Sequence, residues 1–178
     1  MAERVTMPIN GFFNKTIAYT TDFQRSYLFK VLLPNYDDVT YFVSATATPQ
    51  ETSSTINIDW MNSQLKIGGR TTFNEWTVTV RDKIDSGIYK YFESWRKFVY
   101  DKATGTSLIP GAYKDWAILQ LLDNNGNTQQ EFELRGAFPT TVASATYDYS
   151  TDGIITFAVT FAYDDFITLT DGGTVGAG

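Results

Sequence analysis

The sequence predicts a mostly β protein, an antiparallel β-sandwich or partial barrel with one flanking α-helix. Its apolar stretches are short, rich in β-branched and aromatic residues, and often alternate with polar residues, as half-buried strands do. Only one stretch, which begins at Ser86, has a helical period. No internal repeat or linker divides the 178 residues, a length that fits a single domain. We therefore expect one domain that spans residues 1–178.

Four strands are expected in the first half of the chain. The first ends before Pro34 and the second before Pro49, because proline has no N–H to donate to a sheet ladder. The four expected strands cover residues 27–33, 39–48, 55–60 and 73–81. Gly68 and Gly69 lie between the last two, where they predict a turn with positive φ. A phosphate-binding loop does not fit there, since such a loop opens a helix and a strand follows instead.

Alternation in the third and fourth strands separates two faces. Ile56, Ile58 and Trp60 share one face of the third strand, and Asn57 and Asp59 share the other. In the fourth strand one face carries Trp76, Val78 and Val80, and the other carries Glu75, Thr77, Thr79 and Arg81. We expect the apolar faces to be buried in the core or in an interface, a more ordinary use of tryptophan than a carbohydrate-binding platform.

The helix is expected to begin near Asp85 or Ser86, either of which suits an N-cap. Its apolar residues recur at intervals of four, three and four, namely at Ile88, Phe92, Trp95 and Val99. Such a stripe predicts a helix that packs with one side on the sheet.

Two hairpins are expected in the second half of the chain. Residues 116–122 and 131–135 flank Asp123-Asn124-Asn125-Gly126-Asn127, where Asn-Gly favours a type I′ turn. The second turn, at 150–153, lies between expected strands at 142–149 and 154–163. The first turn resembles a calcium loop in composition, but Thr128 and Leu134 stand where an EF-hand requires Gly and Glu. We therefore favour a plain hairpin turn.

Composition argues against several classes of function. The chain has no histidine and no cysteine, which removes the commonest general base, thiolate nucleophiles, disulfides and the usual zinc ligands. The adjacent acids at 37–38 and 164–165 would point to opposite faces of an extended chain, so neither pair predicts a shared proton or metal. We expect no catalytic, cofactor-binding or metal site, and no cofactor. The net charge of −6 also argues against a surface that grips DNA.

The two ends of the chain differ in composition from the rest. The first 15 residues lack the apolar core of a signal peptide, and no apolar run approaches the roughly 20 residues of a membrane span. We expect no membrane anchor. A leader over about residues 1–22 and a glycine-rich tail over about residues 168–178 are expected to be mobile, because nothing ties them down.

Two segments of the chain carry a family resemblance. The first, residues 60–80, reads WMNSQLKIGGRTTFNEWTVTV, and the second joins FPTTV at 138–142 with FAVTFAYD at 157–164. In content and order these segments resemble the tail tube protein of T4-like contractile bacteriophages. Together they bracket most of the chain, from about Ala45 to Phe166.

The resemblance implies a structural subunit and not an enzyme. In that family six copies form a ring, and the rings stack into a hollow tube inside a contractile sheath. Each subunit adds strands to a continuous inner β-barrel through which DNA passes without specific binding. The implied partners are other copies of the chain, the sheath protein, the baseplate tube initiator and the tail terminator. Assembly in the host cytoplasm and a place in the virion tail are implied as well.

Two alternatives to this function stay open. One is a tube subunit of a tail-like bacteriocin or injection system, because these devices share the fold. The other is a non-viral β-sandwich module that binds a ligand.

If the chain forms a tube, two sets of its residues are candidates for a role in it, one set for lining the bore and the other for contact between rings. An acidic lining would repel DNA and not hold it. The acids opposite the apolar faces are Asp59, Glu75, Glu131 and Glu133. We expect these four to face the bore, Asp59 and Glu75 first, and the alternative is that they lie on the outer wall under the sheath. A polar segment without an apolar anchor is expected to project as a loop toward an adjacent ring; it consists of Gln50, Glu51, Thr52, Ser53 and Ser54. An ordinary exposed loop is the alternative for that segment.

Overall fold

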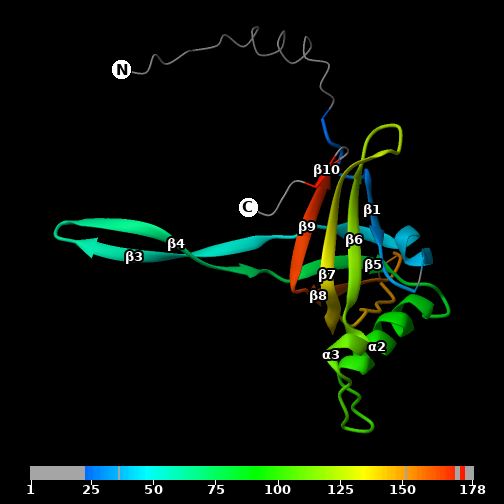
Figure 1. Cartoon of the computed structure of the whole chain (residues 1–178). Coiled ribbons are helices and arrows are strands. Elements are labelled where there is room, and N and C mark those ends of the chain that lie inside the picture. The colour runs from blue at the N-terminus through cyan, green and yellow to red at the C-terminus, as the bar shows by residue number, and fades with distance from the viewer. Residues whose placement is uncertain (1–22, 36, 151, 171–172, 175–178) are drawn as a thin grey trace.

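The computed structural model describes residues 23–35, 37–150, 152–170 and 173–174. The expected leader at 1–22, and the part of the expected tail at 171–172 and 175–178, lie outside the described residues. Figure 1 shows a curled sheet, a helix at its lower end and a long hairpin that projects from one side. The strands are β1 (Phe29–Leu32), β2 (Val43–Thr46), β3 (Glu51–Trp60), β4 (Ser63–Phe73), β5 (Trp76–Arg81), β6 (Asp115–Leu122), β7 (Thr128–Val142), β8 (Thr156–Ala162), β9 (Asp165–Thr170) and β10 (Gly173–Thr174). The helices are the 3₁₀ turn η1 (Asp37–Tyr41), α2 (Gly87–Val99) and the single turn α3 (Pro110–Tyr113).

Eight of these strands form one antiparallel sheet that curls around the core. Its order is β1-β6-β7-β8-β5-β2, with β9 paired to β7 and β10 paired to β9. Within the described residues β1 and β2 end the path without pairing to each other, so the sheet is a partial barrel and is not closed. The predicted antiparallel fold with one substantial helix is confirmed.

Strand β7 belongs to both halves of the sheet. Residues 130–135 pair with β6 on one side and β9 on the other, whereas residues 138–142 pair with β8. The two parts meet at Gly136, whose φ of 63° lies in the left-handed region that favours glycine. A glycine at this position therefore lets one strand leave one half of the sheet and enter the other.

The core lies between the two halves of the sheet and helix α2. The expected alternation is confirmed in β5, where Trp76, Val78 and Val80 are buried and Thr77 is exposed. Strands β6, β7 and β8 add further apolar side chains to the same core, which are Ala117, Leu119, Phe132, Leu134, Ala137, Phe157, Val159 and Phe161. The aromatic content that the composition shows is thus largely used to fill this core.

Helix α2 covers the lower end of the sheet, as the spacing of its apolar residues predicts. Ile88, Phe92 and Trp95 are buried, and the rings of Phe92 and Trp95 lie 6.1 and 5.8 Å from that of Phe161 in β8. Ser86 is the N-cap residue, but the side chain that caps the helix is that of Asp85, whose carboxylate accepts a hydrogen bond from the Gly87 N–H at 3.0 Å.

The turn between β6 and β7 is a hairpin turn, as expected, but of a different type. The Asp123 carboxylate accepts hydrogen bonds from the N–H groups of Asn125 and Asn127, both at 2.8 Å. Among the turn residues only Gly126 has a positive φ, 85°, and its N–H donates to the Asp123 carbonyl. This is a type I turn followed by a left-handed glycine, so the expected type I′ turn is wrong.

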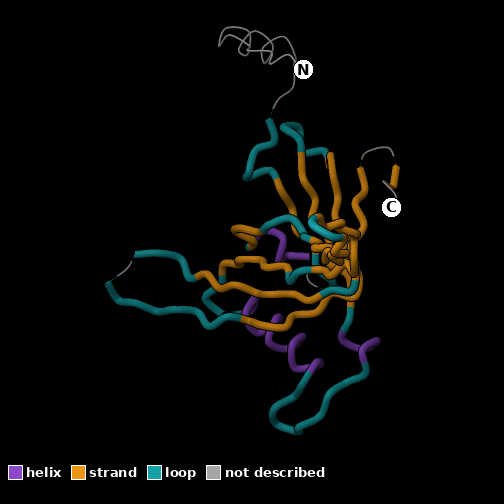
Figure 2. Tube along the Cα trace, turned by 90° about the vertical axis from the view of Figure 1, so that its left-hand side faces the viewer, coloured by secondary structure: helices purple, strands orange, loops and turns teal. Residues whose placement is uncertain are grey.

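Three other expectations are corrected. The expected strand at 39–48 begins as the 3₁₀ turn η1, so only residues 43–46 are strand. The expected strand at 142–149 ends at Val142, and the described residues between it and β8 form a long loop. Figure 2 shows that this loop projects from the sheet. The expected tail begins later than residue 168, because residues 168–170 belong to β9, where pairing with β7 holds them.

Candidate assembly surface

Strands β3 and β4 form a hairpin that stands away from the rest of the protein. Among the strands that the structure describes they pair only with each other, as a separate two-stranded sheet, and the ribbon extends far to the left of the curled sheet in Figure 1. All ten residues of β3 are exposed. A two-stranded ribbon is at best marginally stable alone in water. We call this projecting hairpin the arm, and we expect it to need contact with another surface for its stability.

The base of the hairpin is anchored on the body. The Gln50 carbonyl accepts a hydrogen bond from the Asn74 N–H at 2.9 Å and another from the Tyr163 hydroxyl at 3.2 Å. Burial raises the pKa of this hydroxyl above its usual value, and the nearby charge of Glu51 raises it further. The ring of Phe73 lies 5.9 Å from both the Tyr163 ring and the Phe166 ring. These contacts fix the direction in which the hairpin leaves the sheet.

A β-bulge separates this anchored base from the outer part of the hairpin. The pairing register shifts between Ser53 and Thr55, and a side chain at Gly69 would collide with Ser54. Both Gly68 and Gly69 lie inside β4, and Gly69 lies where Ser54 of the partner strand approaches closely, so the expected turn at these glycines is wrong. The chain instead reverses after Trp60, and Met61 takes a positive φ of 51° there.

One face of the outer hairpin is apolar. Ile56 pairs with Ile67, and Ile58 pairs with Leu65, so that these four side chains lie on the same face as Trp60. Their exposed fractions are 55% for Ile56, 44% for Ile58, 60% for Leu65, 46% for Ile67 and 70% for Trp60. The alternation that usually marks a face toward the core here marks a face that none of the described residues of the chain covers. A contiguous exposed apolar patch of this kind is typical of a protein–protein contact.

The opposite face of the hairpin is polar. Asn57 pairs with Lys66, and Asp59 pairs with Gln64. The Gln64 side-chain amide donates a hydrogen bond to the Asp59 carboxylate at 2.8 Å. The two faces of one ribbon thus differ as sharply as the two faces of a sheet that covers a core.

The structure brings together only two of the four candidate lumen-facing acids. Glu131 and Glu133 lie on the face of β7 that points away from the core, opposite Phe132 and Leu134. The side chain of Gln120 in β6 donates a hydrogen bond to Glu131 at 2.7 Å on this face. These two acids thus belong to the large curled sheet.

The other two candidate acids lie elsewhere. Asp59 is on the outer hairpin, and Glu75 lies in the two-residue link between β4 and β5, outside the strand in which it was expected. Both are exposed. They therefore do not share the sheet face of the β7 acids.

The candidate inter-ring segment is not a loop. Gln50 precedes β3, and residues 51–54 form the first part of that strand, where 51–53 pair with 71–73 of β4. The segment has no apolar side chain, but backbone pairing and the hydrogen bonds to the Gln50 carbonyl hold it in place. Residues 51–54 are ordered because β3 pairs with the more distant β4, and the residue types of the segment alone do not predict this.

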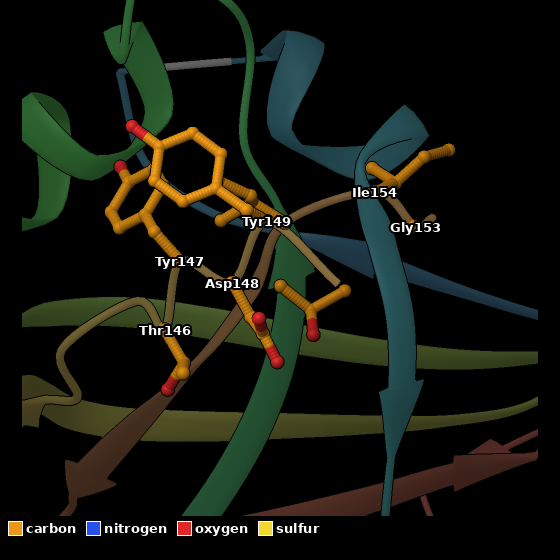
Figure 3. Close-up of a pocket in the computed structure, with 8 residues that line it drawn as sticks. Thr146, Tyr147, Asp148, Tyr149, Gly153 and Ile154 are labelled. Carbon is orange, nitrogen blue, oxygen red and sulfur yellow. The ribbon is translucent and has the colours of Figure 1, made fainter. Parts of the chain in front are cut away.

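The sequence pattern does not predict a second exposed apolar surface, which lies in the loop between β7 and β8. The loop between β7 and β8 carries Tyr147, Tyr149 and Ile154, which are 73%, 112% and 73% exposed. They line an open pocket of about 610 Å³. Figure 3 shows the two tyrosine side chains, with the Asp148 carboxylate turned away from both rings. The alternation of Tyr147 and Tyr149 predicts a strand, and no local signal shows that the residues lie beyond the end of pairing.

In the described part of the chain, the side chains that could ligate a metal ion lie apart from one another. Among the described residues no group of three or more carboxylates could hold a metal ion. The adjacent acids at the end of β8 diverge, as expected: Lys114 Nζ lies 2.6 Å from an Asp164 oxygen, while Arg135 lies 3.8 Å from an oxygen of Asp165. The described part of the chain also has no helix that is long and apolar enough to cross a bilayer.

The fold and the exposed hairpin define a class of protein: a β-structured subunit that presents an exposed apolar face on a projecting ribbon. The family model of the phage tail tube protein matches residues 5–169. The tail tube protein gp19 of Enterobacteria phage T4 is 31% identical over 147 residues, which is 80% of this chain and 90% of that protein. The corresponding protein of Enterobacteria phage T6 is equally similar, and the tail tube protein of Serratia phage KSP90 is 26% identical over 114 residues, 64% of each chain.

The chain belongs to the phage tail tube protein family, and it is a structural subunit of a phage tail tube. Solved structures agree at the level of the fold. A chain from the sheath–tube complex of an extracellular contractile injection system in its extended state superimposes with a TM-score of 0.64 and 18% identity, covering 88% of this chain and 97% of that one. A chain from the tube-terminating cap of the anti-feeding prophage gives a TM-score of 0.63 with 16% identity, covering 85% and 94%.

Proposed function

We propose that six copies of this protein form a ring, and that the rings stack into a hollow tube that carries DNA inside a contractile sheath. In this role the chain has no enzymatic activity. It is assembled in the host cytoplasm, and its partners are further copies of itself, the sheath protein, the baseplate tube initiator and the tail terminator. The proposal rests on the family membership and on solved structures of similar fold that come from a sheath–tube complex and a tube-terminating cap.

One observation carries the proposal: the uncovered apolar face of the outer hairpin. Burial of one large apolar side chain stabilises by about 1.5–3 kcal/mol. Five such side chains on this face, each 44–70% exposed, therefore gain several kcal/mol when another copy covers them. A ligand-binding module would gain nothing from an arm that exposes these residues to water.

The base of the hairpin is proposed to position this arm toward an adjacent ring. Residues 50–54 and their partners at 71–73 lie between the body and the β-bulge. Their side chains are exposed, and hydroxyl groups pair across the ribbon, as those of Ser53 and Thr71 do at 2.9 Å. A polar, hydrogen-bonded base of this kind holds the arm out without adhering to the subunit's own sheet.

The outer face of the curled sheet is proposed to line the bore. Glu131 and Glu133 lie on that face, and six copies of each would repeat around every ring. Like charges repel DNA phosphates over about 8 Å at physiological ionic strength, so the conduit would not hold its cargo. Asp59 and Glu75 are proposed as lumen-facing only if the hairpin and its link also reach the bore.

Electron microscopy of the purified protein tests the proposal. We expect rings or cylinders with six subunits per ring at high protein concentration. A variant with both Ile56→Ser and Ile58→Ser should remain folded and should not form long cylinders, because it removes apolar side chains that the described residues of the subunit leave exposed.

The matched control changes the other face of the same strand. Thr55→Ser with Asn57→Ser alters two exposed neighbours whose side chains point to the polar face, and this variant should form normal cylinders. A wild-type protein that stays monomeric under all these conditions would contradict the tube function. Equal loss of cylinders in both variants would contradict the role of the apolar face.

A further inference from the structure

We propose that Asn125 is a site of slow chemical modification, at which the side-chain amide is converted to a carboxylate, and that the hydrogen bonds of Asp123 set the rate. The site lies in the turn between β6 and β7, at the upper end of the sheet in Figure 1. The reaction requires only the folded subunit and water. It therefore takes place whether or not the subunit joins a tube.

The reaction uses the backbone nitrogen of Gly126 as the nucleophile. This nitrogen gives up its proton to a solvent base and attacks the side-chain carbonyl carbon of Asn125, and the side-chain nitrogen takes up a proton and leaves as ammonia. The five-membered succinimide ring that results is opened by water at one of its two carbonyl groups. Water attack gives aspartate at one carbonyl and isoaspartate at the other, and no oxidant or reductant is consumed.

The residue types at this position favour the attack sterically. Gly126 has no side chain to shield its own nitrogen, and both Asn125 and Gly126 are exposed to water. In the part of the chain that the structure describes, the side-chain amide of Asn125 makes no hydrogen bond that would hold it away from that nitrogen. The pair is the only Asn-Gly sequence among the described residues, since the other one, at 10–11, lies outside them.

The backbone of the folded turn opposes the attack. The third residue of a type I turn, here Asn125, has a ψ of about 0°. Ring closure requires a different rotation, in which the Gly126 nitrogen lies on the same side as the Asn125 Cβ. The Gly126 N–H also donates a hydrogen bond to the Asp123 carbonyl at 3.1 Å. That bond must break before the nitrogen can turn toward the side chain.

The side chain of Asp123 holds the turn closed. Its carboxylate accepts hydrogen bonds from the N–H groups of Asn125 and Asn127, both at 2.8 Å. The bond from the Asn127 backbone, and then that from Asn125, lower the pKa of this carboxyl below its usual value. The group is therefore charged at neutral pH, and hydrogen bonds to a charged group are stronger than those between neutral groups. Removal of this side chain should free Asn125 to rotate and should accelerate the modification.

The loop between β7 and β8 offers a matched position without such bonds. Asp152 and Gly153 are exposed and belong to no helix or strand. Within the described residues the Gly153 N–H makes no hydrogen bond. Asp152→Asn therefore places a second Asn-Gly pair, of identical chemistry, in a segment whose backbone is not held as that of the β6–β7 turn is held.

Peptide mass spectrometry of the full-length protein tests the inference. Wild type, Asp152→Asn and Asp123→Ala are incubated in mildly alkaline buffer, folded and in parallel unfolded in urea. Trypsin cleaves after lysine and arginine, so Asn125, position 152 and the pair at 10–11 fall in three different peptides, and fragmentation locates the change from amide to acid. The ratio of the rate in urea to the rate in the folded protein gives the protection at each site, and this ratio cancels the effect of neighbouring residues on the intrinsic rate.

We expect Asn125 of the folded wild type to be protected by about tenfold or more, and position 152 of Asp152→Asn to be protected little. Asp123→Ala should lose most of the protection at Asn125. Equal protection at the two positions would overturn the inference, as would unchanged protection in folded Asp123→Ala. A failure of Asn125 to convert in urea, under conditions that convert position 152 of Asp152→Asn, would also overturn it.

Hydrogen exchange at the Gly126 N–H gives a second measure that needs no substitution at Asp123. Exchange and modification both require this N–H to leave the Asp123 carbonyl, so both follow the opening of the turn. Low concentrations of urea, at which the protein stays folded, should accelerate the two processes by similar factors. A modification rate that rises while exchange at Gly126 does not would show that the conversion does not depend on turn opening, and would overturn the role of Asp123.

Discussion

The carboxylate of Asp164 fills the space beside Gly136 where any other residue would place its Cβ. Both Asp164 oxygens accept hydrogen bonds from Lys114 Nζ, at 2.6 and 2.8 Å, and the Asp164 N–H donates to the Arg135 carbonyl at 3.0 Å. The point at which β7 changes partners is therefore closed by side chains from the segments that precede β6 and follow β8.

Gly136→Ala should destabilise the protein by about 2–4 kcal/mol. A left-handed alanine costs about 1–2 kcal/mol, and the new methyl must also displace Asp164 from Lys114. Gly105→Ala is the matched control, because Gly105 has a similar φ of 68° and nothing within 4 Å of an added Cβ. This control should lose only the stability that a left-handed alanine costs. Urea unfolding measures both variants, and equal losses would show that the contact with Asp164 contributes nothing.

Tube formation should shift tryptophan fluorescence to shorter wavelength, mainly through Trp60. This residue is 70% exposed in the subunit, whereas Trp76 and Trp95 are already buried. Trp60→Phe should remove most of the shift in cylinders that still form. Trp116→Phe is the control, since Trp116 is 41% exposed on the body and should leave most of the shift in place. A shift that survives Trp60→Phe would place the hairpin tip in water within the tube.

The acids of β7 should control the passage of DNA. Glu131→Lys with Glu133→Lys should leave cylinders intact but slow DNA ejection, because phosphates would bind the new cations, and the defect should ease at high salt. Asp59→Lys with Glu75→Lys makes the same change of charge on the hairpin and its link. If ejection slows only in this second pair, the bore is lined by the hairpin and not by the curled sheet.

The β6–β7 hairpin should weaken in acid through Asp123. Hydrogen bonds from the backbone of Asn127, and then of Asn125, lower the pKa of this carboxyl below its usual 3.8. The stabilising effect of the charge is therefore complete above pH 3.8 and is lost as the pH falls through the lower pKa of the folded protein.

Asp123→Asn should accordingly destabilise the protein at pH 7, and the difference from wild type should shrink as the pH falls below 3.8. Asp152→Asn removes the same charge away from the turn and controls for net charge. Urea unfolding at pH 7 and near pH 2.5 makes the comparison, and a difference that does not change with pH would contradict the prediction.

The local spacing of apolar residues predicted those helices and strands that bury their apolar side chains against the same subunit. The spacing of Ile88, Phe92 and Trp95 predicted helix α2 because a single stripe meets a single sheet. Alternation in β5 predicted its core face for the same reason. The Asn-Gly sequence located the β6–β7 turn, although the bonds made by Asp123 selected the turn type.

Pairing between segments distant in the sequence determines the features that the local residue pattern does not predict. Ile56, Ile58 and Trp60 have the alternation of a core strand, and nothing in their sequence shows that the described body of the protein leaves this face exposed. Gly68 and Gly69 suggest a turn by composition, but the close approach of Ser54 explains at least Gly69. Which acids share a face follows from the pairing of β7 with β6 and β9, and sequence alternation orders residues only within one strand.

The passage of β7 through both halves of the sheet has a mechanical consequence. Two sheets that merely pack face to face resist sliding through side-chain contacts alone. Here a shearing force between the halves loads the covalent backbone of one continuous strand, and its bend at Gly136 is braced by Asp164 and Lys114. A subunit built in this way transmits thrust as a single stiff body, which is the property that a rod pushed from one end requires.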